Sequence, residues 1–306
     1  MRAFVRLVVV LAVLGGAVFY WLTMPERIYP STVPAHVVDL ANGERMFWAG
    51  GCGSCHAVAK ASGDEKLKLG GRQELVTPFG TFRVPNISPD IATGIGGWSN
   101  ADFITAMVKG VSPGERHYYP AFPYTSHQHM TREDLIDLKG FLDTFPAVVN
   151  KVGPHDLAFP FNIRRGLGLW KLLYLDGKTF TPDPAASDAV NRGAYLVNGP
   201  GHSLRRMPHT ADFIGGPRMY RFLAGGPAPE GEGVVPNLTP DKNGLGSWSE
   251  ADIAYALETG FTPDYDTLGG SMTSVQENMV HLPAEDWAAI AAYLKSIPPI
   301  ATASGK

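Results

Sequence analysis

The sequence predicts a mainly α-helical protein in which two tandem domains of one plan follow a single N-terminal transmembrane helix. Three observations carry this prediction. The opening segment is apolar, a block of sequence recurs about 150 residues further on, and apolar residues recur at helical spacing near the end of each copy. At 306 residues the chain also exceeds the size at which single cores usually stop growing.

Composition narrows the function classes. The chain has 26 basic and 29 acidic residues, so it lacks the basic field that nucleic-acid binding needs, and we expect no nucleic-acid partner. Glycine and proline make up about a fifth of the residues, which implies long loops. The apolar content of 44% is that of a folded protein.

The N-terminal segment, residues 1–24, predicts a membrane anchor. Arg2 and Arg6 precede an uncharged run over 7–24 that is long enough to span a bilayer. The aromatic residues 19–21 stand where a signal peptide would be cleaved and resemble an interfacial belt. We therefore expect a single-pass protein of the bacterial inner membrane with its body in the periplasm, reached through a linker over 25–37. A cleaved signal peptide is the alternative and puts the body in the same compartment.

The two cysteines carry the strongest motif in the chain. Cys52, Cys55 and His56 form Cys-Xaa-Xaa-Cys-His, the attachment signature of haem c, in which two thiols bind one porphyrin and the histidine becomes an axial ligand of the iron. An exported protein with two cysteines would otherwise suggest a disulfide. A thioredoxin-type dithiol expects a preceding strand, and a zinc site expects a second pair of ligands. Neither is visible in the sequence.

The flanks of the motif predict a class I-like cytochrome c domain over 38–150. A short helix over 42–50 with an aromatic face runs into the motif. A second helix begins at a capping-box pattern of Thr131 and Asp134 and carries apolar residues at helical spacing until Pro146. Two helices that bracket a haem-wrapping loop are typical of small cytochromes c.

The second axial ligand is expected to be Met130, because this ligand is usually a methionine shortly before the last helix. His127, His129 and Met107 are alternatives. Met107 lies on a helix predicted after Ser99, where core packing is the favoured role.

The repeat predicts the second domain, over 188–300. Residues 84–90 and 98–103 reappear at 235–241 and 248–253, and a closing helix again begins at 282–286 and ends at Pro298. Between the domains, 151–187 is a connector whose stretch over 160–173 is apolar. Residues 301–306 form a tail.

These marks together resemble the dihaem and trihaem cytochrome c subunits of membrane-bound alcohol, gluconate and related dehydrogenases. The resemblance rests on the haem motif, the paired Pro-Asn-(Ile/Leu)-(Ser/Thr)-Pro-Asp runs, the connector over 161–165 and the run over 193–196. It implies that each domain carries its own haem motif and methionine ligand. In the second domain that methionine would be Met272, which is a ligand only if a second haem is present.

The second haem motif is missing. Where the family has its cysteines, this chain reads Ser-Leu-Arg-Arg-Met-Pro-His after His202, so one covalent haem is predicted. The segment 203–211 can, however, be encoded by codons whose alternative frame reads His-Cys-Gly-Glu-Cys-His-Thr-Pro-Arg. We hypothesise that a pair of compensating frameshifts erased the motif, in which case two haems are expected. His202, Met207 and His209 are candidates for holding a non-covalent haem.

A haem with both axial positions filled transfers electrons and has no open site for substrate. The resemblance implies a circuit in which a periplasmic dehydrogenase catalytic subunit supplies electrons and a quinone or terminal oxidase accepts them. The chain is then an electron-transfer subunit rather than an enzyme. The alternatives are a two-domain haem enzyme of the peroxidase or thiosulfate-oxidising class, with an open iron site, and a haem-free scaffold.

Overall fold

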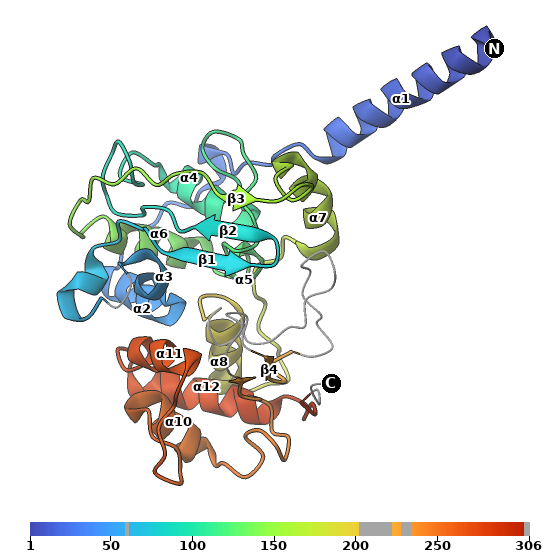
Figure 1. Ribbon diagram of the computed structural model, residues 1–306. Helices are drawn as coiled ribbons and strands as arrows, with labels where there is room; N and C mark the ends of the chain where they lie inside the picture. The colour runs from blue at the N-terminus through green and yellow to red at the C-terminus, as the bar shows by residue number, and fades with distance from the viewer. Residues whose placement is uncertain (59–60, 202–221, 228–233, 303–306) are drawn as a thin grey trace.

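The computed structural model describes residues 1–58, 61–201, 222–227 and 234–302, and it confirms the mainly helical fold (Figure 1). The helices are α1 (Arg2–Leu22), α2 (Leu40–Gly50), α3 (Cys52–His56), α4 (Asn100–Ile104), α5 (Tyr124–His127), α6 (Arg132–Leu142), α7 (Leu167–Tyr174), α8 (Asp188–Asn198), α10 (Glu250–Thr259), α11 (Ser271–Met279) and α12 (Ala284–Ser296). The strands are β1 (Glu74–Thr77), β2 (Gly80–Arg83), β3 (Asp156–Leu157), β4 (Gly226–Pro227) and β5 (Val234–Val235).

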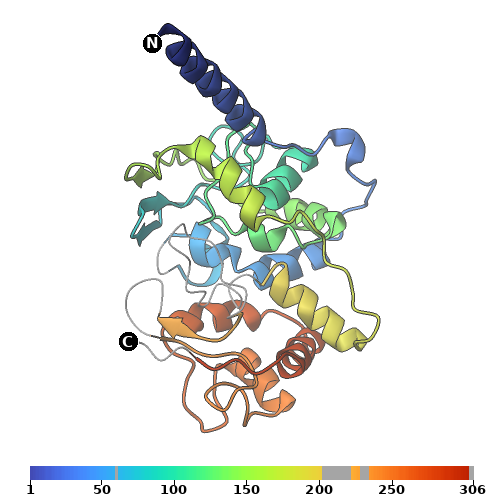
Figure 2. The ribbon, with the colours of Figure 1, turned by 90° about the vertical axis from the view of Figure 1, so that its right-hand side faces the viewer.

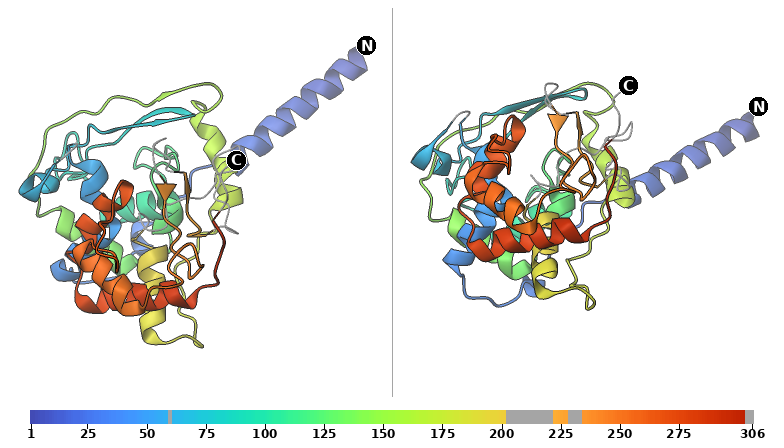
Figure 3. Two further views of the ribbon diagram at one scale, coloured as in Figure 1. Left: turned by 60° about the horizontal axis from the view of Figure 1, so that its bottom comes forward. Right: turned by 90° about the horizontal axis from the view of Figure 1, so that it is seen from below.

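The N-terminal helix α1 projects away from the body in every view (Figures 1 to 3). None of its residues is buried, and its mean hydropathy is 2.3. Among the described residues it is the one helix long and apolar enough to cross a membrane, a test that a signal sequence also passes.

The first half of the body is organised by the crossing of α2 and α6. At the crossing a Cβ on Gly43 would lie 2.2 Å from the Asp137 carbonyl oxygen, so only glycine lets the two backbones approach this closely. Both predicted helices are present, with two differences. The helix α6 ends at Leu142 rather than at Pro146. Its capping box is half formed, because the Asp134 carboxylate binds Asn42 and Tyr195 instead of the cap.

A small antiparallel sheet, not predicted from the sequence, covers this half. The strands β1 and β2 form a hairpin, and β3 at the start of the connector pairs with β2 through Gly80 and Thr81. The connector therefore begins as part of the first half.

The second half repeats the helix crossing with α8 and α12, which lie across each other below the first half in Figure 2. A Cβ on Gly193 would lie 1.9 Å from the Ala289 carbonyl oxygen. Gly193 thus allows α8 to approach α12 closely, as Gly43 allows α2 to approach α6. The helix α10 packs beside α12.

The loops of the two halves make matching contacts. The side-chain amides of Asn86 and Asn237 each donate to a backbone carbonyl late in their own half, at 2.7 Å in both cases. The predicted helix after Ser99 is α4, which continues into a π-helical turn at Thr105–Lys109. A full capping box starts α4 at Ser99 and another starts α10 at Ser249.

The two halves pack directly on each other. Trp48 of α2 stacks on His281 with ring centroids 3.6 Å apart, and one continuous buried cluster contains side chains from both halves. The haem-motif helix α3 lies on the side of the first half that faces α11 (Figure 1).

Candidate functional site

The predicted haem motif lines a cavity of about 560 Å³ in the first half. The left-handed conformation of Gly51 (φ 58°) ends α2 and begins α3. The helix α3 brings Cys52, Cys55 and His56 to the cavity wall. The volume lies within the range of about 300–1,000 Å³ that small-molecule and cofactor sites occupy.

His56 is held in one orientation by the protein. Its Nδ1 donates to the Pro85 carbonyl oxygen at 2.9 Å, which leaves Nε2 as the electron-pair donor of the ring. The ring touches the open cavity on one side, yet burial lowers the pKa of His56 to about 4, partly offset by the Pro85 hydrogen bond. The imidazole is therefore neutral at pH 7, which is the form that binds iron.

Cys52 and Cys55 are not joined in a disulfide. Burial, followed by the charge of the neighbouring Cys55, raises the pKa of Cys52 to about 12. Catalytic dithiols need the opposite, a thiolate stabilised at neutral pH. The motif also follows the helix α2 and not a strand. Chemistry and topology therefore both argue against a thioredoxin-type redox site.

The remaining walls suit a flat apolar ring that carries acidic groups. Arg83, Arg116 and Arg164 are the cationic residues of the wall, and arginine pairs well with carboxylates such as the haem propionates. Arg164 comes from the connector and is stacked on the Tyr119 ring, 4.7 Å from its centroid. The larger apolar and aromatic residues of the wall include Leu75, Phe82, Val84, Ile87, Ile95, Trp98, Phe103, Met107, Tyr118, Tyr119, Phe122, Leu138 and Leu142. The residues present thus fit a haem.

The expected second ligand, Met130, is not among the residues that line the cavity. Its side chain is 1% exposed, and its Cγ would lie 3.4 Å from a Cβ on Gly199. The short helix α5, which was not predicted from the sequence, ends at His127, and Met130 packs toward the second half in the core between the two halves.

Of the three alternatives, His127 and Met107 line the cavity and His129 does not. His127 is buried at the end of α5, and its ring meets the Phe122 ring edge to face at 5.6 Å. His129 instead hydrogen-bonds the Lys178 carbonyl oxygen through Nδ1.

In the second half, Met272 is buried at the start of α11 as part of the core. The altered motif, with His202, Met207 and His209, lies outside the described residues. The connector also contributes to the first cavity, through His155 and Arg164, and the sequence did not indicate this. The apolar run over 160–173 indicates that the connector packs against the body, but it does not indicate that the connector lines the cavity.

Comparison with known proteins supports a cytochrome c domain in this chain. The family model for cytochrome c matches residues 40–146. The chain is 50% identical over 291 residues to a protein named "Diheme cytochrome c-type" from Cereibacter sphaeroides, covering 95% of this chain and 96% of that protein.

Two further relatives are cytochrome subunits of dehydrogenases. The fructose dehydrogenase cytochrome subunit of Gluconobacter japonicus is 32% identical, covering 88% of this chain and 54% of the relative. The cytochrome c subunit of the quinone-type alcohol dehydrogenase of Gluconacetobacter polyoxogenes is 34% identical, covering 84% and 55%. The chain thus spans about half the length of each of these two. It belongs to the cytochrome c family that contains dihaem cytochromes c and the cytochrome subunits of fructose, alcohol and gluconate dehydrogenases.

Proposed function

We propose that this chain is a membrane-anchored periplasmic c-type cytochrome that transfers electrons from a partner dehydrogenase to quinone or a terminal oxidase. The observation that carries the proposal is the joint position of both cysteines and His56 on one cavity, with the His56 ring fixed by the Pro85 carbonyl. Bound haem c supplies reversible one-electron chemistry. The chain's own residues hold it, exclude water from its faces and neutralise its acidic groups.

Within this proposal Cys52 and Cys55 would hold the porphyrin through thioethers, and His56 would bind its iron through Nε2. For the second ligand the sequence position favours Met130, whereas cavity lining supports His127 or Met107. We favour His127, because Met107 lies on the continuous helical segment that packs α4 into the core. Bis-histidine ligation gives a lower reduction potential than histidine–methionine ligation.

The ligand is tested on the haem-loaded protein with three matched variants, His127→Ala, Met107→Leu and Met130→Leu. We expect only His127→Ala to convert the ferric haem from low spin to high spin by electron paramagnetic resonance. The parent should lack the long-wavelength ferric absorption band that a thioether sulfur produces. That band in the parent, lost in Met130→Leu or Met107→Leu, would assign the methionine instead.

We further propose the tandem arrangement, a haem domain over 38–150 and a second cytochrome c-like domain over 188–300 joined by the connector over 151–187. The matching close approaches at Gly43 and Gly193 and the matching capping boxes support it. One covalent haem is proposed, with Met272 a ligand only if a second haem is present. Pyridine haemochrome spectra against protein concentration count the haems, and the codons over 203–211 test the frameshift hypothesis.

The proposed electron donor rests on the relatives. Proteins named as cytochrome subunits of fructose and alcohol dehydrogenases match most of this chain, which supports a dehydrogenase catalytic subunit as the donor. The helix α1 supports a location at the inner membrane. Purification from detergent-extracted membranes should recover a catalytic subunit with the cytochrome, and its repeated absence would count against this role.

A second candidate function rests on the position of Met130 away from the cavity. If neither His127 nor Met107 binds the iron, a coordination position would be open, and a peroxidase or thiosulfate-oxidising activity would become possible. Binding of cyanide to a high-spin ferric haem in the parent protein would favour this enzyme class over the relay.

A further inference from the structure

The helix α7 in the connector presents an apolar face to solvent. Leu169, Leu172 and Leu173 are 40%, 61% and 69% exposed and lie on one side at the i, i+3, i+4 spacing of a helix. The opposite side, with Gly168 and Lys171, is buried. In a helix of a soluble domain the leucine side would face the core.

The segment before α7 extends this surface. Phe159, Phe161 and Ile163 are also exposed apolar residues, at 78%, 38% and 50%. We refer to these three residues and the three leucines of α7 as the connector patch. Soluble monomers seldom expose so many large apolar side chains from one short stretch, and such surfaces usually contact a partner or a membrane.

The connector patch is attached to the base of α1. A Cβ on Gly168 would lie 2.6 Å from the Thr23 Cα, so the backbone of α7 lies directly against the end of the anchor. Arg165 donates to the Thr23 hydroxyl and to the Tyr20 carbonyl, both at 2.9 Å. Its guanidinium also stacks 4.2 Å from the Tyr20 ring centroid.

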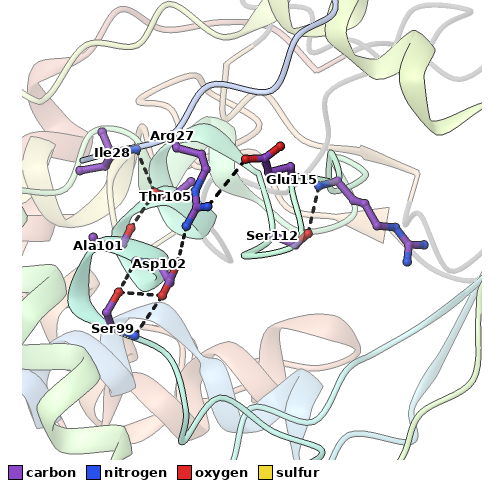
Figure 4. Close-up of polar contacts among 9 residues, drawn as sticks. Arg27, Ile28, Ser99, Ala101, Asp102, Thr105, Ser112 and Glu115 are labelled. Carbon is purple, nitrogen blue, oxygen red and sulfur yellow. Dashed lines mark hydrogen bonds and ion pairs between the residues drawn. The ribbon is translucent and has the colours of Figure 1, made fainter. Parts of the chain in front are cut away.

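A second set of contacts holds the end of α1 and the residues that follow it to the haem-binding half. His117 donates from Nε2 to the Thr23 carbonyl at 3.0 Å and accepts at Nδ1 from the Lys171 ammonium at 3.1 Å. Beyond the anchor, Arg27 pairs with Asp102 of α4 at 2.7 Å (Figure 4). The Ile28 backbone amide donates to the Thr105 hydroxyl at 3.0 Å (Figure 4). The end of α1 is therefore fixed against both α7 and α4.

We propose that the connector patch lies in the interfacial layer of the bilayer that α1 spans, as a second membrane contact. Lipid is the occupant because the segment that carries the patch is packed against the end of the span through Arg165 and Gly168. Tyr20 and Trp21 mark the height of the interface, and Gly168 touches the next turn of chain at Thr23. In Figure 1, α7 turns away from the direction of α1 at its base, as a helix lying in the membrane surface must.

This contact has a consequence for electron transfer. Arg164 lines the haem cavity and stands between Ile163 of the patch and Arg165 of the anchor contact. With the patch in lipid, the part of the cavity lined by Arg164 lies close to the membrane surface. A lipid-soluble acceptor can then approach the haem from that side. The inference rests on α1 spanning the bilayer, which is part of the proposed function.

The test uses the full haem-loaded chain in nanodiscs of phosphatidylcholine. With Cys52 and Cys55 consumed by haem, a single added cysteine takes a nitroxide spin label at Leu172→Cys. Leu11→Cys in α1 is the lipid control, and Tyr265→Cys, 85% exposed in the second half, is the water control. We expect the label at 172 to collide more with lipid-soluble oxygen than with a water-soluble nickel chelate, as at 11 and opposite to 265.

Leu173→Cys repeats the measurement in case one label disturbs α7. A water-like label at both 172 and 173, with the label at 11 in lipid, overturns the inference and leaves the anchor intact. A water-like label at 11 overturns the anchor itself. Shielding of 172 only after a dehydrogenase subunit is added would make the patch a protein interface and would also refute the lipid contact.

Discussion

A single buried carboxylate joins the two halves of the molecule, and its neutralisation should weaken the whole fold. The Asp286 side chain at the start of α12 is 0% exposed. It accepts from the Arg45 Nε at 2.5 Å and from the Arg192 Nε and Nη2 at 2.9 and 3.2 Å. Arg45 is on α2 of the first half and Arg192 is on α8 of the second.

The change Asp286→Asn keeps the shape of the side chain and removes its charge. Breaking a buried ion pair costs about 3–5 kcal/mol, because the remaining charge is left buried without its partner. The two arginine side chains are 27% and 32% exposed, so water can recover part of their hydration. We therefore expect the lower end, a loss of roughly 3 kcal/mol in the free energy of unfolding. This corresponds to a fall of roughly 5 °C in Tm for a chain of 306 residues.

The assay is guanidinium denaturation of the haem-loaded chain in detergent, followed by tryptophan fluorescence and haem absorption. Glu285→Gln is the matched control, since its side chain is 70% exposed while it pairs with the same Arg45 at 2.8 Å. We expect that control to cost less than about 1 kcal/mol. A double-mutant cycle with Arg45→Met should show strong coupling to Asp286→Asn. Equal effects of the two acidic variants, or additive effects in the cycle, would refute the reasoning.

Three further predictions concern packing, haem attachment and pH. Gly43→Ala and Gly193→Ala should each lower the free energy of unfolding by about 1–3 kcal/mol in urea titrations, because the added methyl meets a backbone carbonyl at the helix crossing. Cys52→Ala should keep its haem in acidified organic solvent through one thioether, whereas the double variant with Cys55→Ala should release it; mass spectrometry distinguishes the two. Burial lowers the pKa of His117, so the unfolded chain binds more protons below the ordinary histidine pKa of about 6.5. Stability should therefore fall as the pH drops from about 6.5 through the folded pKa, and His117→Asn should flatten that slope in unfolding curves.

The helices α2, α6, α4 and α12 were predictable because each has a local signal for its start or its apolar face. The Ser99 cap, for example, forms the contacts that its sequence pattern specifies. The sheet was not predictable in this way. The strand β1 is four residues long with alternating half-buried positions, and the third strand of the sheet, β3, comes from the connector far along the chain. Pairing between such short strands depends on the tertiary fold that brings them together.

The contrast between local signals and tertiary packing also divides the residues of the candidate haem site into two groups. Cys52, Cys55 and His56 lie within one five-residue helix, so α3 alone brings all three to the cavity, and a local sequence motif can predict them as a group. The rest of the lining includes His127, Met107 and Arg164 of the connector, three residues from separate segments that only the tertiary fold brings to one cavity. Met130 had the expected place before the last helix, but the turn of α5 directs it into the core between the halves. A ligand that must reach a cavity through tertiary structure cannot be assigned from its distance along the chain, and so the second axial position needs the spectroscopic test.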